Sequence, residues 1–293
     1  MPKPPHNVAY LERAIRRLSD SNAGAVSARS TLASVVAGQF LDGAVMRGGG
    51  SLKLRYGAET TRFTVDFDAC RNVPEDEFAA AYARRLSEGW AGFSGWLAKR
   101  PKARPQGVPG AYVMQPFEVK LSYLNHPWCT VDLEVSYSEV GDADEAEIVP
   151  LPDDVKKLFS ELGFPEPRSV PLMRIPHQIA QKLHGVTDRR SSRVQDLIDL
   201  QLIAARESVD WAEVNAICGR LFANRKLQPW PCRLAPSGEW RDAYGAMSRG
   251  MENLLSFDDA VKWADELIAR ISASGQSGPK SQVLARTIAP KAP

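Results

Sequence analysis

Two acidic residues, Asp66 and Asp68, lie two positions apart in a segment whose polar and apolar side chains alternate (62–68, RFTVDFD). Alternation with a period of two predicts a half-buried strand whose apolar residues face the core, with both aspartates on the opposite face. Adjacent carboxylates repel each other unless a cation lies between them, and Mg²⁺ prefers oxygen ligands and substrate phosphates. We therefore expect a metal site here; the alternative is a solvated strand face.

A run of three glycines precedes this segment (47–51, RGGGS) and follows a short apolar stretch. A strand, a glycine turn and the start of a helix would direct free backbone N–H groups toward one point, which is an anion site. Because a side chain would block the approach of phosphates, we expect Ser51, or the backbone of Gly49 and Gly50, to hold them. The alternative is a flexible turn, since the run matches neither the P-loop nor the dinucleotide pattern.

A second alternating segment carries further acids (130–137, TVDLEVSY). Its apolar residues would face the core, and Asp132 and Glu134 would point outward. A third carboxylate is expected if two metal ions bridge the attacking and leaving oxygens. We favour Glu134 for this role, with Asp132 as the second choice; the alternative is an ordinary amphipathic strand.

The second half of the chain carries another group of charged residues on predicted helices. Lys182 lies on a helix predicted over 176–185, and Asp196 and Asp199 are i, i+3 neighbours on the next one, one turn after Arg193. We expect Lys182 to reach a phosphate and the two aspartates to position it. The alternative is a salt-bridge network that joins the two helices.

In their order along the chain, these segments resemble the AbiEii/AbiGii family of nucleotidyltransferase toxins, DNA-polymerase-β-like enzymes that include the MenT toxins. The resemblance covers roughly residues 40 to 205. The family's Lys-Gly-Gly-Thr-Ala-Leu run is matched by 47–52 and its Arg-x-Ser-x-Asp-x-Asp pattern by 62–68. Its strand acid is matched by Glu134, its Lys-Leu-His helix by 182–184, and its Arg and Asp-x-x-Asp pattern by 193–199.

The chain departs from the family pattern at four positions. Arg47 replaces the usual Lys, which keeps the charge but changes the geometry. Gly50 replaces a small hydroxyl residue, Thr64 stands where Ser is common, and the strand acid Glu134 is a Glu rather than an Asp. These departures bear on nucleotide preference and rate more than on the class of reaction.

The resemblance implies an α+β fold: a polymerase-β-like nucleotidyltransferase core with a mixed sheet, followed by a mainly helical C-terminal domain. It implies Mg²⁺- or Mn²⁺-dependent transfer of a nucleotide from an NTP to RNA, at the 3′ end of tRNA, which would block translation. It also implies a cognate antitoxin. The implied catalytic residues are Asp66, Asp68, Glu134 and Lys182, of which the three acids are the metal ligands. The implied nucleotide-binding residues are Arg47, Gly48, Gly49, Gly50, Ser51, Arg62, Thr64, Arg193, Asp196 and Asp199.

Two other functions remain open from the residues. One is an enzyme of the same fold that modifies a protein or a small molecule. The other is a non-catalytic module that binds nucleotide, against which the intact set of Asp66, Asp68 and Glu134 argues.

The predicted organisation has a nucleotidyltransferase core over 1–150, a helical domain over 151–273 and a flexible tail over 274–293. Strands are expected at 44–47, 62–68, 111–123 and 128–138. Helices are expected over 8–19, 25–42, 75–98, 153–162, 176–185, 193–206, 210–222, 238–252 and 257–272.

The composition is that of an ordinary globular protein, with 44% hydrophobic and 25% charged residues among 293 and a net charge of +2. This charge does not by itself indicate nucleic-acid binding. The four cysteines lack paired metal-ligand spacing, and no apolar run is long enough to span a membrane. We expect a cytoplasmic monomer with free thiols.

Overall fold

A computed structural model describes residues 2–103 and 113–275, and the chain divides into two compact units, Met1–Met173 and Arg174–Pro293. We expected the boundary near residue 150. It lies later because α5 (Asp153–Glu161) and β7 (Leu172–Met173) pack in the first unit. The tail expected over 274–293 falls outside the described residues from position 276 onward.

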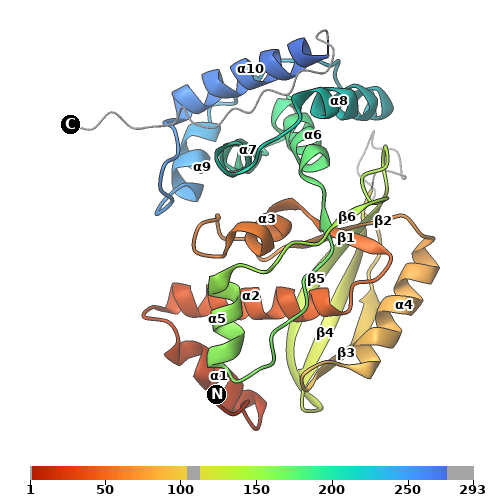
Figure 1. The fold of residues 1–293 in the computed structure, drawn as a ribbon, viewed down its shortest axis with the longest axis vertical. Helices are drawn as coiled ribbons and strands as arrows, with labels where there is room; N and C mark the ends of the chain where they lie inside the picture. Colours follow the sequence, from red (N-terminus) through yellow and green to blue (C-terminus); the bar gives the residue numbers. More distant parts are fainter. Residues whose placement is uncertain (1, 104–112, 276–293) are drawn as a thin grey trace. The chain divides into compact units, whose positions relative to one another are not determined.

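The first unit is built from a mixed sheet and five helices within the described residues (Figure 1). The sheet order is β3-β4-β5-β2-β1-β7-β6, with parallel pairs at β2–β5 and β1–β7 and antiparallel pairs elsewhere. This confirms the predicted α+β class with a mixed sheet. The remaining elements of the unit are α1 (Val8–Arg17), α2 (Asn22–Gln39), β1 (Ala44–Arg47), α3 (Gly48–Tyr56), β2 (Phe67–Arg71), α4 (Glu75–Glu88), β3 (Phe93–Lys99), β4 (Gln115–Tyr123), β5 (His126–Tyr137) and β6 (Ala146–Glu147).

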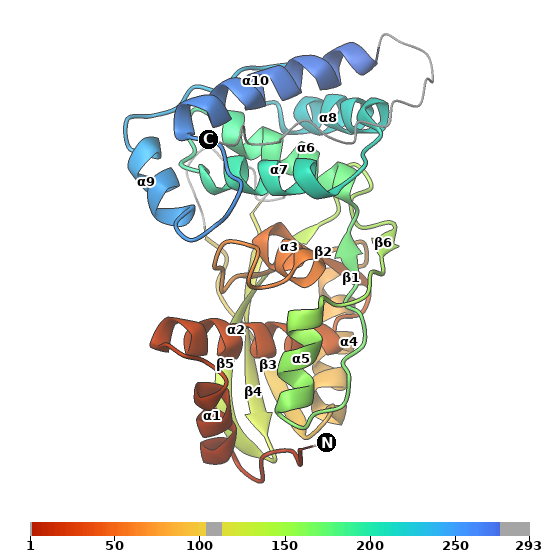
Figure 2. The same cartoon turned by 60° about the vertical axis from the view of Figure 1, so that its left-hand side comes forward.

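One face of the sheet is buried under helices, and this face holds the core of the unit (Figure 2). Along β4 every second residue is buried, and β5 alternates in the same way from Val131 to Val135. The inward row Phe67, Leu133 and Phe117 runs across three neighbouring strands at one register level. Because side chains alternate across a strand, the next residue on each strand points to the opposite face.

The hairpin between β4 and β5 has a two-residue turn, Leu124–Asn125, and both residues have positive φ angles of 48° and 65°. Such a turn matches the right-handed twist of the strands that it joins. The register of β4 against β5 shifts by one residue between Ser122 and Leu121, so the turn and this irregularity together determine which face each acid of β5 occupies.

The helix expected over 75–98 is shorter than predicted. It ends at Glu88 because Gly89 adopts a φ of 75°, and Gly92 has a φ of 84° in the turn that follows. Residues from Phe93 onward then form β3, which pairs antiparallel with β4. Pairing with the sheet prevails there over the helical pattern of the Ala- and Arg-rich sequence.

The second unit is helical over its described residues, 174–275, as predicted (Figure 1). Its core is formed by apolar side chains from all of its helices, among them Leu183, Ile198, Leu221 and Ile268. None of the helices among the described residues of the chain has the length and apolarity needed to cross a membrane. The helices of this unit are α6 (Ile175–Thr187), α7 (Gln195–Arg206), α8 (Trp211–Arg225), α9 (Trp240–Met247) and α10 (Phe257–Ser274).

Candidate active site

Two of the predicted acids are direct neighbours in the sheet. In the parallel pairing of β2 with β5, Asp68 lies opposite Glu134, one step beyond the buried pair Phe67 and Leu133. Since the pair Phe67–Leu133 faces the core, Asp68 and Glu134 share the opposite face of the sheet. The register therefore favours Glu134 over Asp132 as the acid beside Asp68.

The segment before β2 is not the alternating strand that the sequence predicts. Strand β2 begins only at Phe67, and Phe63 and Val65 are 58% and 54% exposed instead of facing the core. Thr64, expected on the outer face, is buried. The predicted inward face is therefore wrong for Phe63 and Val65, because contacts with α2 and α3 turn Thr64 inward, whereas Asp66 is exposed as predicted.

Those contacts converge on the Thr64 backbone and on its hydroxyl. The Thr64 carbonyl accepts hydrogen bonds from Lys53 Nζ and from Ser30 Oγ, each at 3.3 Å. The Thr64 hydroxyl accepts from the Asp66 N–H at 3.3 Å and lies 3.5 Å from Asp66 Oδ2. Thr64, predicted to bind nucleotide, therefore orients Asp66 in this structure.

The three glycines form the first turn of α3 rather than a separate loop. Gly48 has a φ of 70°, and a β-carbon there would come within 2.7 Å of an Asp68 carboxylate oxygen. A β-carbon on Gly49 would lie 2.6 Å from Arg62 Nη2, and one on Gly50 would lie 2.9 Å from the Asp66 carbonyl oxygen. The glycines are thus required for the close packing of α3 against the acidic segment.

The start of α3 is a suitable place for an anion. The first N–H groups of a helix have no partner within the helix, and the helix dipole favours negative charge there. The Arg62 guanidinium lies against the same turn, at Gly49. Ser51, predicted as one of the groups that hold phosphate, is buried, and its hydroxyl donates to the Gly48 carbonyl at 2.9 Å.

Lys53 is a component of the site that the sequence analysis did not single out. Its side chain is 3% exposed within α3, and its ammonium group hydrogen-bonds the Thr64 carbonyl. Burial lowers the pKa of Lys53 to about 8, although the nearby Asp66 charge acts in the opposite direction. A usable signal exists in the sequence, since Lys53 lies four residues after Gly49 and thus on the same helix face.

Glu134 lies in an electrostatic environment that disfavours its ionised form. Partial burial is the main cause of a raised pKa for Glu134, and the charges of Asp68 and Asp66 raise it further. Arg47 acts in the opposite direction on this pKa and also donates from Nη2 to Met114 Sδ at 2.9 Å. The carboxylates of the two strands and the arginine at the end of β1 therefore interact with one another.

The donor set fits a magnesium ion that is completed by substrate, and does not fit a closed protein cage. Among the described residues, no three His, Cys, Asp or Glu side chains are arranged to hold a metal ion. Mg²⁺ is commonly bound by one or two carboxylates together with substrate phosphates. Asp66 and Asp68, beside a helix start that attracts anions, supply such a partial site.

The remaining predicted residues lie in the second unit and form a buried ion-pair network. Lys182 Nζ on α6 lies 2.6 Å from Asp199 Oδ2 and 3.4 Å from Asp196 Oδ1 on α7. Arg193 Nε lies 2.6 Å from Asp196 Oδ2. Only the arginine is exposed, with 52% of its side chain accessible, whereas Lys182 and both aspartates are buried. The helix-to-helix network that the sequence left open is formed.

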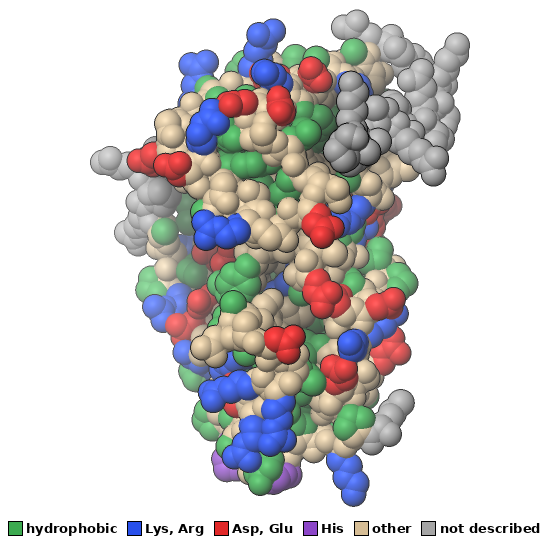
Figure 3. Space-filling model, turned by 90° about the vertical axis from the view of Figure 1, so that its left-hand side faces the viewer, with side chains coloured by type: hydrophobic (Ala, Val, Ile, Leu, Met, Phe, Trp, Pro, Cys, Tyr) green, Lys and Arg blue, Asp and Glu red, His purple; other side chains and the backbone are tan. Residues whose placement is uncertain are grey.

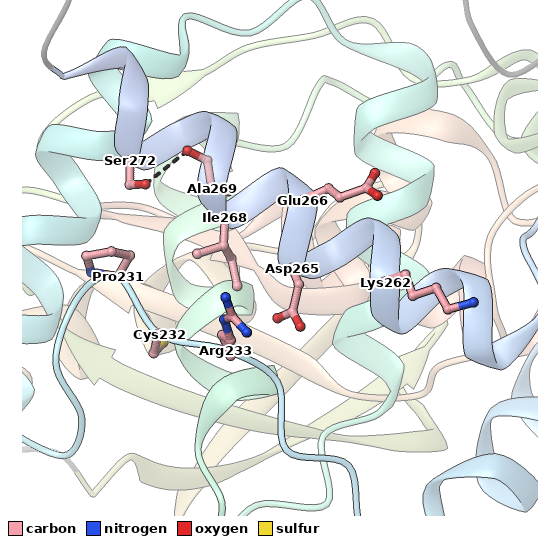
Figure 4. A pocket seen from close by; sticks show the side chains of 9 residues that line it. All are labelled: Pro231, Cys232, Arg233, Lys262, Asp265, Glu266, Ile268, Ala269 and Ser272. Carbon is pink, nitrogen blue, oxygen red and sulfur yellow. Dashed lines mark hydrogen bonds between the residues drawn. The ribbon is translucent and has the colours of Figure 1, made fainter.

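A glycine on α6 makes this network possible. A β-carbon on Gly185 would collide with the Asp196 carboxylate and would lie 2.8 Å from Arg193 Nε. The same unit contains a pocket of about 580 Å³ between α10 and the segment 231–233 (Figure 4). Its lining includes Arg233, Lys262 and Asp265, and none of the predicted site residues.

Carboxylates on adjacent strands, next to a helix start that can bind phosphate, are the arrangement expected of an enzyme that transfers a phosphoryl or nucleotidyl group. A family model described as "Nucleotidyl transferase AbiEii toxin, Type IV TA system" matches residues 30–266. The chain belongs to this family of nucleotidyltransferase toxins, whose members are paired with an antitoxin.

Comparison with solved structures gives similar proteins at low identity. MenT4, a nucleotidyltransferase toxin from Mycobacterium tuberculosis H37Rv, is 18% identical with a TM-score of 0.48, over 92% of this chain and 99% of that one. JHP933 from Helicobacter pylori is 14% identical with a TM-score of 0.43, over 88% and 95%. A putative nucleotidyltransferase from H. pylori is also 14% identical with a TM-score of 0.43, over 86% and 96%. No curated protein matches the chain.

Proposed function

We propose that this toxin transfers a nucleoside monophosphate from an NTP to the 3′-terminal hydroxyl of tRNA, so that the blocked tRNA end stops translation. The observation that supports the proposal is the pairing of Asp68 with Glu134 across β2 and β5, directly beside the glycine start of α3. Transfer to a hydroxyl needs an anion site for the triphosphate and a group that accepts the hydroxyl proton, and the site offers both.

In the proposed reaction, the acceptor hydroxyl oxygen forms a bond to the α-phosphorus of the NTP. The bond from that phosphorus to the bridging oxygen of the β-phosphate breaks, and pyrophosphate leaves. Glu134 accepts the hydroxyl proton; its raised pKa suits a general base better than that of an ordinary surface glutamate. Atoms and charge balance without any further reactant.

The triphosphate is held by the backbone N–H groups at the start of α3, with Arg62 against the same turn and Arg47 at its edge. Asp66 and Asp68 would hold Mg²⁺, which when bound supplies positive charge to the phosphates and to the leaving group. Lys53 and Thr64 keep Asp66 in place from the interior of the unit. Little covalent work remains for the protein, as is usual in phosphoryl transfer.

The roles proposed for Lys182, Arg193, Asp196 and Asp199 stay predictions. In the described state the Lys182 ammonium interacts with two carboxylates and is buried, so it offers no free surface to a phosphate. Arg193 is the exposed member of this group, and we propose that it is the one that contacts RNA or nucleotide phosphates. A cognate antitoxin, a cytoplasmic location and a monomeric state complete the proposal.

The direct test is to incubate the purified protein with Mg²⁺, total tRNA and each α-³²P-labelled NTP in turn, beside an Asp68→Asn variant. We expect label on tRNA with the wild type and a loss of about 10²-fold or more with the variant, since one interaction that stabilises the transition state is removed. An Asp144→Asn variant, in a loop of the same unit, is the matched control.

Three results would contradict the proposal. Label on a protein or on a small molecule would assign a different acceptor to the same chemistry. Binding of Mg²⁺ and NTP without any transfer would favour a non-catalytic module. Equal activity in wild type and Asp68→Asn would exclude this site as the reaction centre.

A further inference from the structure

The exposed face of α1 carries positive charge and aromatic rings that the proposed active site does not use. Arg13, Arg16 and Arg17 are exposed on this helix, as are Tyr10 and His6 at and just before its start. We call these five residues the α1 basic face. In Figure 3, Lys and Arg side chains gather in the lower part of the view, at the level where Figure 1 places α1.

The arginines of this face lack acidic partners within the described residues, unlike Lys99 and Arg85 of the same unit. Lys99 pairs with Glu75 at 2.5 Å, and Arg85 pairs with Asp42 at 2.7 Å. The one acid within α1, Glu12, points away from the face. It accepts from Trp128 Nε1 at 2.7 Å and pairs with Arg29 at 2.8 Å.

The aromatic rings are ordered on the same side of the helix as the arginines. The ring centroids of His6 and Tyr10 lie 3.8 Å apart, and the Arg13 guanidinium lies 4.8 Å from the centroid of the Tyr10 ring. Tyr10 is nevertheless 44% exposed. Positions 10, 13 and 17 follow helical spacing, and the His6 ring, just before the helix, lies against the Tyr10 ring, so one surface presents two rings and two guanidinium groups.

This combination of groups fits RNA. Guanidinium groups pair with phosphates in two-pronged geometry, and aromatic rings stack on unpaired bases. We propose that the α1 basic face binds the sugar–phosphate backbone of the acceptor RNA. This inference rests on the proposed function, and it adds that the acceptor is recognised well away from the end that reacts.

The separation follows from the sheet. Glu12 holds α1 against Trp128 on β5, and Glu134 lies six residues further along the same strand. At about 3.3 Å per strand residue, Trp128 and Glu134 are about 20 Å apart along β5, and Trp128 lies in the core whereas Glu134 lies on the opposite face of the sheet. An RNA of only three nucleotides is too short to reach both, whereas a whole tRNA is long enough.

The test compares two variants with matched changes in charge. Arg13→Gln/Arg17→Gln alters the α1 basic face, and Arg84→Gln/Arg85→Gln alters paired arginines on α4 of the same unit. Binding of 5′-fluorescein-labelled tRNA is measured by anisotropy between 50 and 200 mM salt, roughly the range over which phosphate contacts are resolved. Thermal unfolding shows that both variants are folded.

We expect the first variant to weaken tRNA binding about fivefold or more and to reduce the slope of log K against log salt by about two. The second variant should leave both unchanged. Transfer to a trinucleotide acceptor should be equal in all three proteins, since this acceptor cannot reach α1. Equal tRNA affinity and equal slope in all three proteins would overturn the inference.

The binding measurement needs no turnover, so failure of the proposed function is distinguishable from failure of the inference. If the wild type transfers nucleotide to neither acceptor, the proposed function fails, and the anisotropy still reports whether α1 binds RNA. If the α1 variant loses binding to an acidic protein partner but not to tRNA, the face serves a protein and the inference is wrong.

Discussion

At the scale of single residues, the site depends on side chains whose ionisation is altered by their surroundings. The pKa of Glu134 is raised by partial burial beside other acids. The pKa of Lys53 is lowered by burial within the unit. Each alteration gives a prediction that is independent of the identity of the acceptor or of the nucleotide.

Glu134 should determine the acid side of the pH–rate profile. Its pKa is raised, so the wild-type rate should fall on acidification at a pH above the ordinary range of a glutamate, because a protonated Glu134 cannot accept a proton. In Glu134→Gln the rate should be low throughout and this limb should disappear. The measurement is kcat/KM as a function of pH for both proteins. If the rate of the variant still falls on acidification at the same pH, the group that titrates is not Glu134.

Lys53 should make the stability of the protein depend on pH in the alkaline range. Its pKa is about 8 in the folded state, against 10.5 for the ordinary side chain, so burial of the charge destabilises the fold below pH 8. This cost disappears as the pH rises from 8 to 10.5, because the unfolded chain then binds more protons than the folded one. The shift corresponds to about 3 kcal/mol.

The wild type should therefore gain about 3 kcal/mol in free energy of unfolding relative to Lys53→Met between pH 7 and pH 10.5. Urea denaturation of both proteins across this range measures the difference, and titrations common to both proteins cancel. Two parallel curves would show that Lys53 is not buried as a charged group.

At the scale of secondary-structure elements, the start of α3 and the segment 62–66 act together. The glycines leave room for this segment, so each side chain of the site is held by an element that is distant in sequence. The far end of the Arg62 side chain can move away from a new β-carbon, whereas the Asp66 backbone is held by its packing and cannot. Substitutions at neighbouring glycines should accordingly have different consequences.

Gly49→Ala should displace the Arg62 guanidinium and weaken nucleotide binding with little loss of stability. A new β-carbon would lie 2.6 Å from Arg62 Nη2, the far end of a flexible side chain. In an Arg62→Ala background the same substitution should have almost no further effect on affinity for Mg·NTP. A double-mutant cycle measured by calorimetry checks this coupling, and additive effects would contradict it.

At the scale of the whole molecule, the chain is composed of two units with separate cores. The ion-pair network of the second unit is buried, and removal of one partner leaves an uncompensated charge. Removal of one of these charged side chains should therefore lower the stability of the second unit before that of the first.

Lys182→Met should destabilise the second unit by about 3–5 kcal/mol, because the buried Asp199 would lose the ammonium group at 2.6 Å and Asp196 would keep only Arg193. In Lys182→Met/Asp199→Asn part of this loss should be recovered. Scanning calorimetry of the full chain measures the stability of each variant, and a separate measurement of Mg·NTP affinity shows whether binding is affected as well. If Lys182→Met keeps wild-type stability but loses transfer, the ammonium serves the reaction instead of the fold.

The sequence predicted the elements well where one face is buried and the pattern is regular. The strand that carries Glu134 alternates because its inner face lies on the core, and the helices of the second unit follow their apolar spacing. The prediction is wrong at Phe63, Thr64 and Val65, because the orientation of this segment is determined by Lys53 and Ser30, which approach from other helices. Such contacts over long sequence distances leave no periodic signal.

The same limit applies to the glycines and to Lys182. Three glycines predict a backbone that other groups approach closely, but they do not show that Asp68 and Arg62 are those groups. The spacing of Lys182, Asp196 and Asp199 predicts proximity, but burial of all three follows only from the packing of α6 on α7.

The parallel pairing of β2 with β5 has a consequence for how a cell synthesises this toxin. A chain is made from its N-terminus, and Glu134 reaches its place beside Asp68 only after the hairpin of β4 and β5 has left the ribosome. A prematurely terminated product that ends before β5 contains both aspartates and all three glycines, yet lacks the strand that completes the sheet beside them. On the proposed mechanism such a fragment lacks Glu134 and the strand beside Asp68, so we expect it to be inactive in the nucleotidyl-transfer assay.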